Sequence, residues 1–144
     1  MRVVVQRVSK AFVSVDNQVV GSIDEGLMLL VGFTQDDTLE NIDYMVNKVL
    51  NLRIFPDENG VMNKSVKDTG GSILSISQFT LYGDASKGNR PSYIKALNGE
   101  CAIKLYDKFN EKLKKHVLVE TGVFGADMQV SLVNMGPTTI ILEK

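Results

Sequence analysis

The alternation of apolar and polar side chains in the first third of the chain constrains its fold most strongly. Apolar and polar residues alternate in Arg2–Val8, and the same period of two residues returns in Ala11–Val15. This period is typical of strands that bury one face. The pair Asp16–Asn17 predicts a tight turn, after which Gln18–Ile23 is expected to return as the second strand of a hairpin. Leu27–Phe33 is apolar on both faces, as expected of a central strand covered from two sides.

Two later segments change to the period of an amphipathic helix. The first follows a capping-box pattern at Asp37–Glu40, and its apolar residues recur at spacings of three and four. The second is expected to begin at Asn98 or Gly99 and carries lysines on its other side. The apolar faces of the two predicted helices consist of Ile42, Met45, Val46, Val49 and Leu50, and of Ala102, Leu105, Tyr106, Phe109 and Leu113.

The remaining segments add strands and loops to these helices. Ser72–Ser77 alternates and is expected to continue as a strand into Gln78–Tyr82, whereas the polar segment Asn63–Gly71 predicts a surface loop. Met128–Val133 and Thr138–Leu142 alternate on either side of an interruption. No linker or repeat divides the 144 residues, so we expect one domain. Its predicted class is α+β, with a mostly antiparallel, curled or barrel-like sheet and two main helices packed outside.

Composition and charge limit the function classes that this chain can belong to. Sixteen basic and seventeen acidic residues give a net charge of −1, so any binding of nucleic acid must be local. The longest apolar run, Leu27–Val31, is far shorter than the ~20 residues of a membrane helix. The start of the chain breaks at Gln6 before a signal-like apolar core forms. We therefore expect a cytoplasmic protein that does not interact with membranes.

The single cysteine and the single histidine exclude several common routes to hydrolysis. Cys101 alone cannot form an intrachain disulfide or a multi-cysteine zinc site, and His116 alone argues against a histidine-based metal cluster or a Ser-His-Asp triad. We expect no metal and no cofactor. Cys101 is interpreted as a small buried hydrophobe, and His116 as a complement to a helix dipole.

The first candidate site is the segment Ser77–Tyr82. The hydroxyls of Ser77 and Thr80 and the amide of Gln78 lie at one predicted strand end, where they can supply a nucleophile, a donor and an acceptor. The same residues also fit a cross-strand ladder of hydroxyls with no chemical role. Because no histidine or lysine beside Thr80 can take its proton, Thr80 is a weak nucleophile.

Two further segments differ from plain scaffold. Gly136 and Pro137 interrupt a strand pattern, which fits either an ordinary turn or a rigid main-chain element with outward-pointing carbonyls. An X–Pro bond adopts the cis form at a cost of only ~0.5–1 kcal/mol. The loop Lys87–Pro91 can meet a phosphate through Lys87, Arg90 and free amides, or it can be simply solvated.

Taken together, these segments resemble the D-aminoacyl-tRNA deacylase family, also called the D-tyrosyl-tRNA deacylases, over the whole chain. The combination of an SQFTLY segment with a later NxGP segment is highly specific for this family. Thr138 stands where the family usually has valine, and Met135 replaces a commonly smaller or polar residue. The matching segments are Met1–Val8, Ser77–Tyr82, Gly88–Tyr93 and Asn134–Pro137, together with Thr139.

The resemblance implies an editing hydrolase that cleaves the ester between a D-amino acid, or glycine, and the 3′-terminal adenosine of tRNA. It also implies a homodimer in which the Gly136–Pro137 segment of one subunit enters the pocket of the other. In this picture the Gly136–Pro137 bond is cis, and its carbonyls occupy the space that an L side chain needs. Glycine has no Cβ and escapes such a filter.

The resemblance also implies the roles of individual residues. Thr80 acts either as a nucleophile or as a positioning group, and its lack of a base favours positioning. Arg7 helps to orient the Gly-Pro segment. An aminoacyl ester is already activated, so orientation and oxyanion stabilisation can suffice. The predicted catalytic residues are Ser77, Gln78 and Thr80, and the predicted substrate-binding residues are Phe79, Gly136, Pro137, Thr139 and Arg7.

Two other functions remain open from the residues alone. A non-catalytic nucleic-acid-binding module is indicated by the lysine-rich second helix and by Lys87 and Arg90. A general esterase that uses Thr80 is the weaker alternative, because no base is visible.

Overall fold

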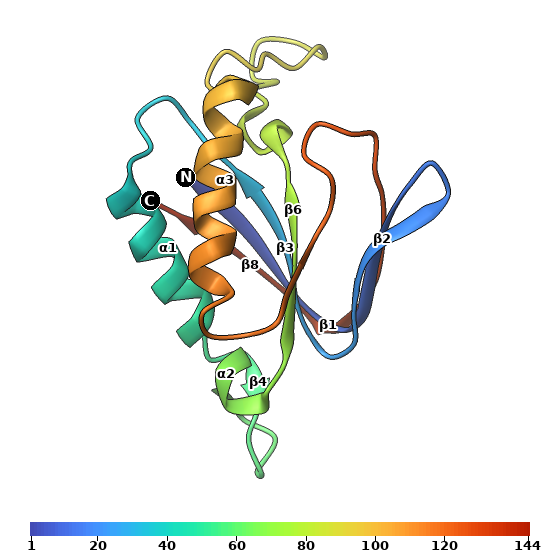
Figure 1. Cartoon of the computed structure of the whole chain (residues 1–144). Coiled ribbons are helices and arrows are strands. Elements are labelled where there is room, and N and C mark those ends of the chain that lie inside the picture. Colours follow the sequence, from blue (N-terminus) through green and yellow to red (C-terminus); the bar gives the residue numbers. More distant parts are fainter.

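The computed structural model describes all 144 residues of the chain and shows an α+β fold built around a curled sheet. The long N-terminal strand is the centre of this sheet, and two helices of 13 and 15 residues cover one of its faces (Figure 1). In chain order the elements are β1 (Arg2–Val15), β2 (Gln18–Ile23), β3 (Gly26–Gly32), α1 (Leu39–Asn51), β4 (Phe55–Pro56), β5 (Met62–Lys64), α2 (Val66–Thr69), β6 (Ser72–Ser77), the 3₁₀ helix η1 (Phe79–Tyr82), α3 (Gly99–Leu113), β7 (Val119–Thr121) and β8 (Gln129–Glu143).

The sheet is mixed, although antiparallel pairs predominate. Along one edge of β1, the first half of β1 pairs with β3 and the second half pairs with β2. Along the other edge, β8 pairs with β1 over almost the whole length of β1. The pairs β3–β6 and β6–β7 are parallel. Gly26 allows β3 and β6 to approach closely, because a Cβ there would lie 1.8 Å from the carbonyl oxygen of Ser72. This pairing sets Val31 opposite Ser77 at the end of β6.

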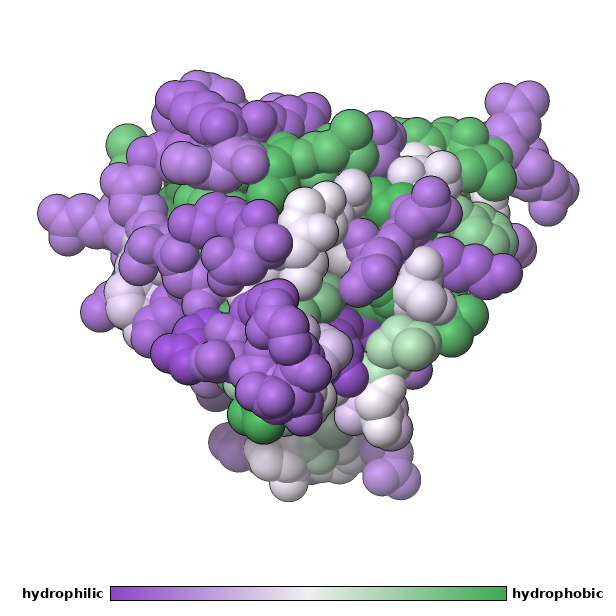
Figure 2. Space-filling model, turned by 90° about the horizontal axis from the view of Figure 1, so that it is seen from below, coloured by the Kyte–Doolittle hydropathy of each residue, from purple (hydrophilic) through white to green (hydrophobic).

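Two apolar clusters fill the space on the two sides of the curled sheet. The larger contains 21 buried residues and lies beneath α1 and α3, whose apolar faces are those that the helical spacing predicts. The smaller contains seven buried residues, contributed by β1, β2, β3 and β6. None of the helices is long and apolar enough to cross a membrane. Seen from the end that carries α2 and β4, the surface is mainly hydrophilic, with separate hydrophobic areas between the polar groups (Figure 2).

The structure corrects several expected boundaries. Arg2–Val15 is one continuous strand, and the segment 63–71 contains β5 and α2 instead of a loop. The helix α1 is capped by Thr38 and Asn41, because the carboxylate of Asp37 instead accepts hydrogen bonds from the amino group of Met1 and from the Thr34 amide. The Gly-Pro sequence does not divide the last strand, since β8 runs through it.

The correction that matters most for function lies after Ser77. The residues Phe79–Tyr82 form a 3₁₀ helix and do not continue β6. The amide of Gln78 still donates to the carbonyl oxygen of Val31 at 2.7 Å, and the chain then leaves the sheet. This turn places the side chains of Gln78 and Phe79 at the end of β6.

Candidate active site

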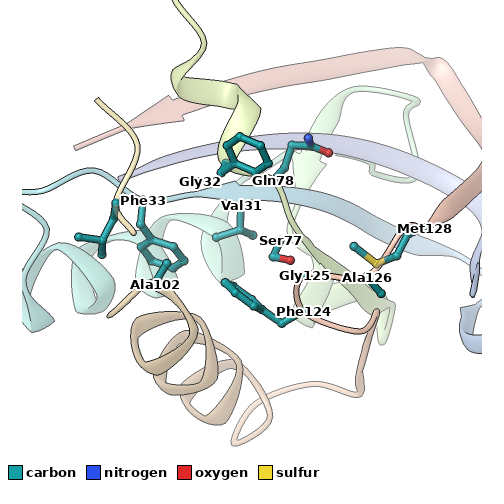
Figure 3. A pocket seen from close by; sticks show the side chains of 12 residues that line it. Val31, Gly32, Phe33, Ser77, Gln78, Ala102, Phe124, Gly125, Ala126 and Met128 are labelled. Carbon is teal, nitrogen blue, oxygen red and sulfur yellow. The ribbon is translucent and has the colours of Figure 1, made fainter. Parts of the chain in front are cut away.

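The end of β6 opens into a small cavity of about 130 Å³. Figure 3 shows the side chain of Ser77 within it, with Val31 and Gln78 on one side and Phe124 on the other. The residues that line it come from four separate parts of the chain and are Val31, Gly32, Phe33, Ser77, Gln78, Phe79, Leu97, Ala102, Phe124, Gly125, Ala126 and Met128.

The cavity contains no ionisable side chain, because eight of its twelve lining residues are hydrophobic and the others are neutral. No cluster of histidine, cysteine, aspartate or glutamate with the geometry of a metal site occurs in the molecule. The single histidine and the single cysteine lie outside this cavity. His116 is exposed just beyond α3, and Cys101 is exposed on α3, so the expectation that Cys101 is a buried hydrophobe is wrong. The cavity can therefore orient a substrate, but it offers no side chain that takes a proton at neutral pH.

Besides the side chains of Ser77 and Gln78, backbone amides at the start of η1 are hydrogen-bond donors next to the cavity. In a helix the first N–H groups have no partner within the helix. The N–H groups of Phe79 and Thr80 donate no hydrogen bond elsewhere in the chain, whereas that of Gln78 is bound to Val31. Free, fixed N–H groups of this kind can stabilise a developing oxyanion.

The structure brings Ser77, Gln78 and Phe79 together at the cavity and places Thr80 beside them. The side-chain nitrogen Nε2 of Gln78 donates a hydrogen bond to the hydroxyl oxygen of Thr80. Thr80 is exposed and does not itself line the cavity. The hydroxyl of Thr80 is thus oriented by a neutral amide and has no base beside it.

The Gly-Pro segment lies in a separate, tightly held bend of β8. The Gly136–Pro137 peptide bond is cis, and Gly136 has a φ of 117°. A Cβ at Gly136 would lie 2.6 Å from the hydroxyl oxygen of Thr138 and 2.8 Å from Nη2 of Arg7, so any other residue would displace these side chains as well as strain the backbone. The side chain of Asn134 spans the bend, because its Oδ1 accepts from the Thr138 amide at 2.9 Å.

Arg7 and Thr139 are parts of this bend. Arg7 donates from Nε and Nη2 to the carbonyl oxygen of Met135 at 3.2 and 3.1 Å, and from Nη1 to that of Ile54 at 2.5 Å. The hydroxyl oxygen of Thr139 accepts hydrogen bonds from the side-chain amides of Gln6 and Asn134. Arg7 therefore links the bend to the segment that follows α1.

Within one chain, the two groups of predicted site residues are not brought together. Arg7, Gly136, Pro137 and Thr139 do not line the cavity at Ser77. Arg7 and Met135 instead border another cavity, of about 190 Å³.

Sequence reasoning missed the opposite wall of the cavity at Ser77. Phe124 and Met128 belong to the connection between β7 and β8, and Ala102 belongs to α3. Nothing in the local pattern of residues 121–128 distinguishes them from an ordinary loop. The only available signal is the concentration of glycine and apolar residues there, which is too weak to indicate a site.

Comparison with known proteins gives two kinds of similarity. A model of the family described as D-Tyr-tRNA(Tyr) deacylase matches residues 4–143. A solved structure described as "c-Myc DNA Unwinding Element Binding Protein" is 43% identical, with a TM-score of 0.95 over 100% of this chain and 99% of the other. A structure of a probable eukaryotic D-amino acid tRNA deacylase is 20% identical and has a TM-score of 0.83 over 98% and 97% of the two chains, which shows a shared fold.

Proposed function

Because the chain belongs to the D-Tyr-tRNA(Tyr) deacylase family and is thus a D-aminoacyl-tRNA deacylase, we propose that it edits tRNA at the cavity around Ser77. The substrate is the ester between a D-amino acid, or glycine, and the 3′-terminal adenosine of tRNA. Water adds to the ester carbonyl carbon, the bond to the ribose oxygen breaks, and that oxygen takes a proton. The observation that carries this proposal is the neutral cavity with free amides at the end of β6 in a chain of this family.

The free amides of Phe79 and Thr80 hold the oxyanion that forms when water adds to the carbonyl. An aminoacyl ester is activated, so fixed donors in a site with little water can lower its barrier without a strong base. The apolar wall formed by Phe124 and Met128 receives the adenosine. In this mechanism the 2′-hydroxyl of the tRNA itself helps to activate the water, which fits a cavity with no ionisable side chain.

Thr80 serves as a positioning residue in this mechanism. Its hydroxyl accepts a hydrogen bond from Gln78, and this contact fixes its orientation. A nucleophilic threonine needs a base to take its proton, and none lies beside it. Ser77 and Gln78 line the cavity at the end of β6 and contact the substrate there. Gln78 also donates the hydrogen bond that orients Thr80.

Chirality is enforced by the Gly136–Pro137 segment of a second copy of the chain. This segment is exposed and does not line the cavity of its own chain. Arg7 and Asn134 hold it rigidly, as a steric filter requires. In the homodimer its carbonyls occupy the space of an L side chain, while a D side chain points elsewhere and glycine has none.

A second candidate function is nucleic-acid binding without catalysis. It is favoured by the name of the 43% identical protein, which describes binding to a DNA element. This function predicts salt-sensitive binding that is the same for aminoacylated and uncharged tRNA.

The test compares D-tyrosyl-tRNA with L-tyrosyl-tRNA, both at the same concentration of purified protein. We expect rapid release of D-tyrosine and little release of L-tyrosine. Equal release of both would contradict the filter, and release of neither would contradict the activity. The variant Thr80→Val is expected to slow hydrolysis without abolishing it, whereas a nucleophilic Thr80 predicts complete loss. Thr69→Val, at an exposed threonine of α2, is the matched control and should leave the rate unchanged.

The dimer is tested by light scattering during gel filtration. We expect a species of about twice 15.9 kDa. A strict monomer that still discriminates between the two esters would contradict the cross-subunit filter.

A further inference from the structure

An exposed pair of aromatic rings lies directly outside the cavity at Ser77. Phe79 is 56% exposed and Tyr93 is 40% exposed, yet their rings touch edge to face with centroids 5.0 Å apart. The other aromatic pair of the molecule includes Tyr106, which is buried. The next residue in the chain, Ile94, is 77% exposed. Two exposed aromatic rings that touch at the edge of a cavity are more than scattered surface hydrophobes.

The backbone around Tyr93 is held in place although its side chain is exposed. Asp84 and Ser92 exchange two backbone hydrogen bonds of 2.8 Å across the loop. The hydroxyl of Thr34 donates to the carbonyl oxygen of Lys95 at 2.6 Å, and Gln35 donates to that of Ile94 at 3.2 Å. The loop that carries Tyr93 lies at the end of the molecule opposite α2 and β4 (Figure 1), and these hydrogen bonds fix its backbone.

The loop that presents Tyr93 is positively charged. Residues 83–95 contain three basic side chains, Lys87, Arg90 and Lys95, and one acidic side chain, Asp84. Lys95 is paired with Asp84 at 3.6 Å, but Lys87 and Arg90 are exposed and form none of the seven ion pairs of the molecule. In a chain with a net charge of −1, this is a local concentration of uncompensated positive charge.

Exposed aromatic rings beside free cations are the combination that binds single-stranded nucleic acid. Bases stack on the rings, and basic side chains contact the phosphates. Phe79 lines the cavity and also contacts Tyr93, so the aromatic pair continues the cavity outward. A polynucleotide whose terminal adenosine occupies the cavity can reach this pair, because Phe79 belongs to both the cavity and the pair.

We propose that Tyr93, together with Phe79, stacks the nucleotide that precedes the terminal adenosine of the tRNA, while Lys87 and Arg90 bind the adjoining phosphates. This inference rests on the proposed deacylase function, and it adds a second binding surface that recognises the single-stranded end of the tRNA and not the ester. The surface raises the affinity for a polynucleotide and leaves the chemistry at the ester unchanged.

The decisive experiment measures hydrolysis of two substrates, D-tyrosyl-tRNA and D-tyrosyl-adenosine, which lacks every other nucleotide. For Tyr93→Ala we expect the KM for the tRNA to rise about tenfold with kcat unchanged, and both constants for the adenosine ester to stay the same. Tyr93→Phe keeps an aromatic ring and should have the wild-type KM for the tRNA. The control Tyr44→Ala removes a tyrosine on α1 that is also 40% exposed, and it should change neither substrate.

The outcomes separate this inference from the proposed function. Equal losses with both substrates, or no loss with either, would contradict a role of Tyr93 in binding the preceding nucleotide. If wild-type protein hydrolyses neither ester, the proposed function fails, and the surface is then tested by binding alone. An uncharged oligoribonucleotide ending in CCA should bind Tyr93→Ala about tenfold more weakly than wild type, and equal binding would refute the inference.

Two additional measurements test the phosphate contacts and the competing occupant. The double variant Lys87→Ala/Arg90→Ala should reduce the slope of log affinity against log salt by about 1.4, because each contact to a single strand contributes about 0.7. An unchanged slope would contradict these contacts. If Tyr93→Ala instead converts a dimer to a monomer, the surface binds a second copy of the chain and the inference is wrong.

Discussion

The helix-covered face of the sheet and the strand β8 differ in how completely the chain buries them. The core between the sheet and the helices α1 and α3 contains 21 buried residues, and one of them, Phe109 on α3, is fully inaccessible. β8 has 15 residues and pairs with β1 along most of its length, yet none of its residues is buried. Its exposed apolar residues include Met135 and Ile141.

This difference separates the stability of the fold from the completion of its site. The helices bury one face of the sheet within a single chain, so the scaffold that holds Ser77 needs nothing else. The Gly136–Pro137 bend lies on a strand whose one face packs against the cores while the other face is exposed. The exposed face of this strand, with its rigid bend and the apolar residues Met135 and Ile141, is what the proposed second copy would contact.

The largest expected effect is on the covered face. Phe109→Ala should lower the free energy of unfolding by about 4 kcal/mol, because it leaves a cavity in the larger core. Ile141→Ala, on β8 at 66% exposure, should change the unfolding of the isolated chain by less than about 0.5 kcal/mol. Urea titration measures both. Similar losses would mean that β8 is as well packed as the covered face.

Arg7 provides a test of the bend itself. Arg7→Leu removes the charged hydrogen bonds to the carbonyl oxygens of Met135 and Ile54. If these bonds hold the bend in the geometry that the site needs, kcat/KM for D-tyrosyl-tRNA should fall about thirtyfold, equivalent to about 2 kcal/mol. The control Arg53→Leu removes an exposed arginine that bonds only Asn63 and should leave kcat/KM unchanged. Equal decreases of kcat/KM in the two variants would contradict a role of Arg7 in the site.

A smaller effect is expected from a single methyl group in the bend. Gly136→Ala places a Cβ within 2.8 Å of Arg7 and within 2.6 Å of Thr138, at a φ of 117°. We expect the preference for the D ester over the L ester to fall about tenfold, or about 1.4 kcal/mol. Gly60→Ala adds a methyl at a φ of 77° with no atom within 4 Å, so it controls for backbone strain alone. An unchanged preference in Gly136→Ala would argue against a filter at this position.

The smallest effect concerns pH and a tyrosine of η1. Burial raises the pKa of Tyr82 from 10.0 to about 12, despite the guanidinium of Arg2 over its ring. A raised pKa means that the folded state favours the protonated phenol. The resulting contribution to the free energy of unfolding is complete below pH 10 and is lost as the pH rises toward 12. Tyr82→Phe should make the alkaline loss of stability less steep, as followed by thermal unfolding. Burial also raises the pKa of Tyr106, so part of the alkaline loss should remain.

The long periodic elements were predictable from the sequence, and the boundaries were not. The apolar faces of α1 and α3, the cap at Asn98 and the α+β class agree with the structure. The segment 79–82 was expected to be strand, because its residues favour strand locally. Only the partner strand β3 shows that the sheet ends at this point. The helix α2 had a readable signal, since Ser65 and Asp68 form a capping box that the sequence displays.

The candidate site also has a part that the sequence predicts and a part that it does not. Ser77, Gln78, Phe79 and Thr80 form a contiguous segment, so their proximity follows from the chain itself. Phe124 and Met128 join them only because the connection from β7 to β8 passes the end of β6. No local pattern predicts a contact between residues almost 50 positions apart.

The sequence by itself determined the two amphipathic helices, the alternating strands and the two motifs, because these depend on neighbours within a few residues. The tertiary structure decided which residues share a cavity, and it decided that the Gly-Pro bend lies apart from the cavity of its own chain. Those outcomes depend on strand pairing and on packing between distant segments, and no short stretch of residues contains that information.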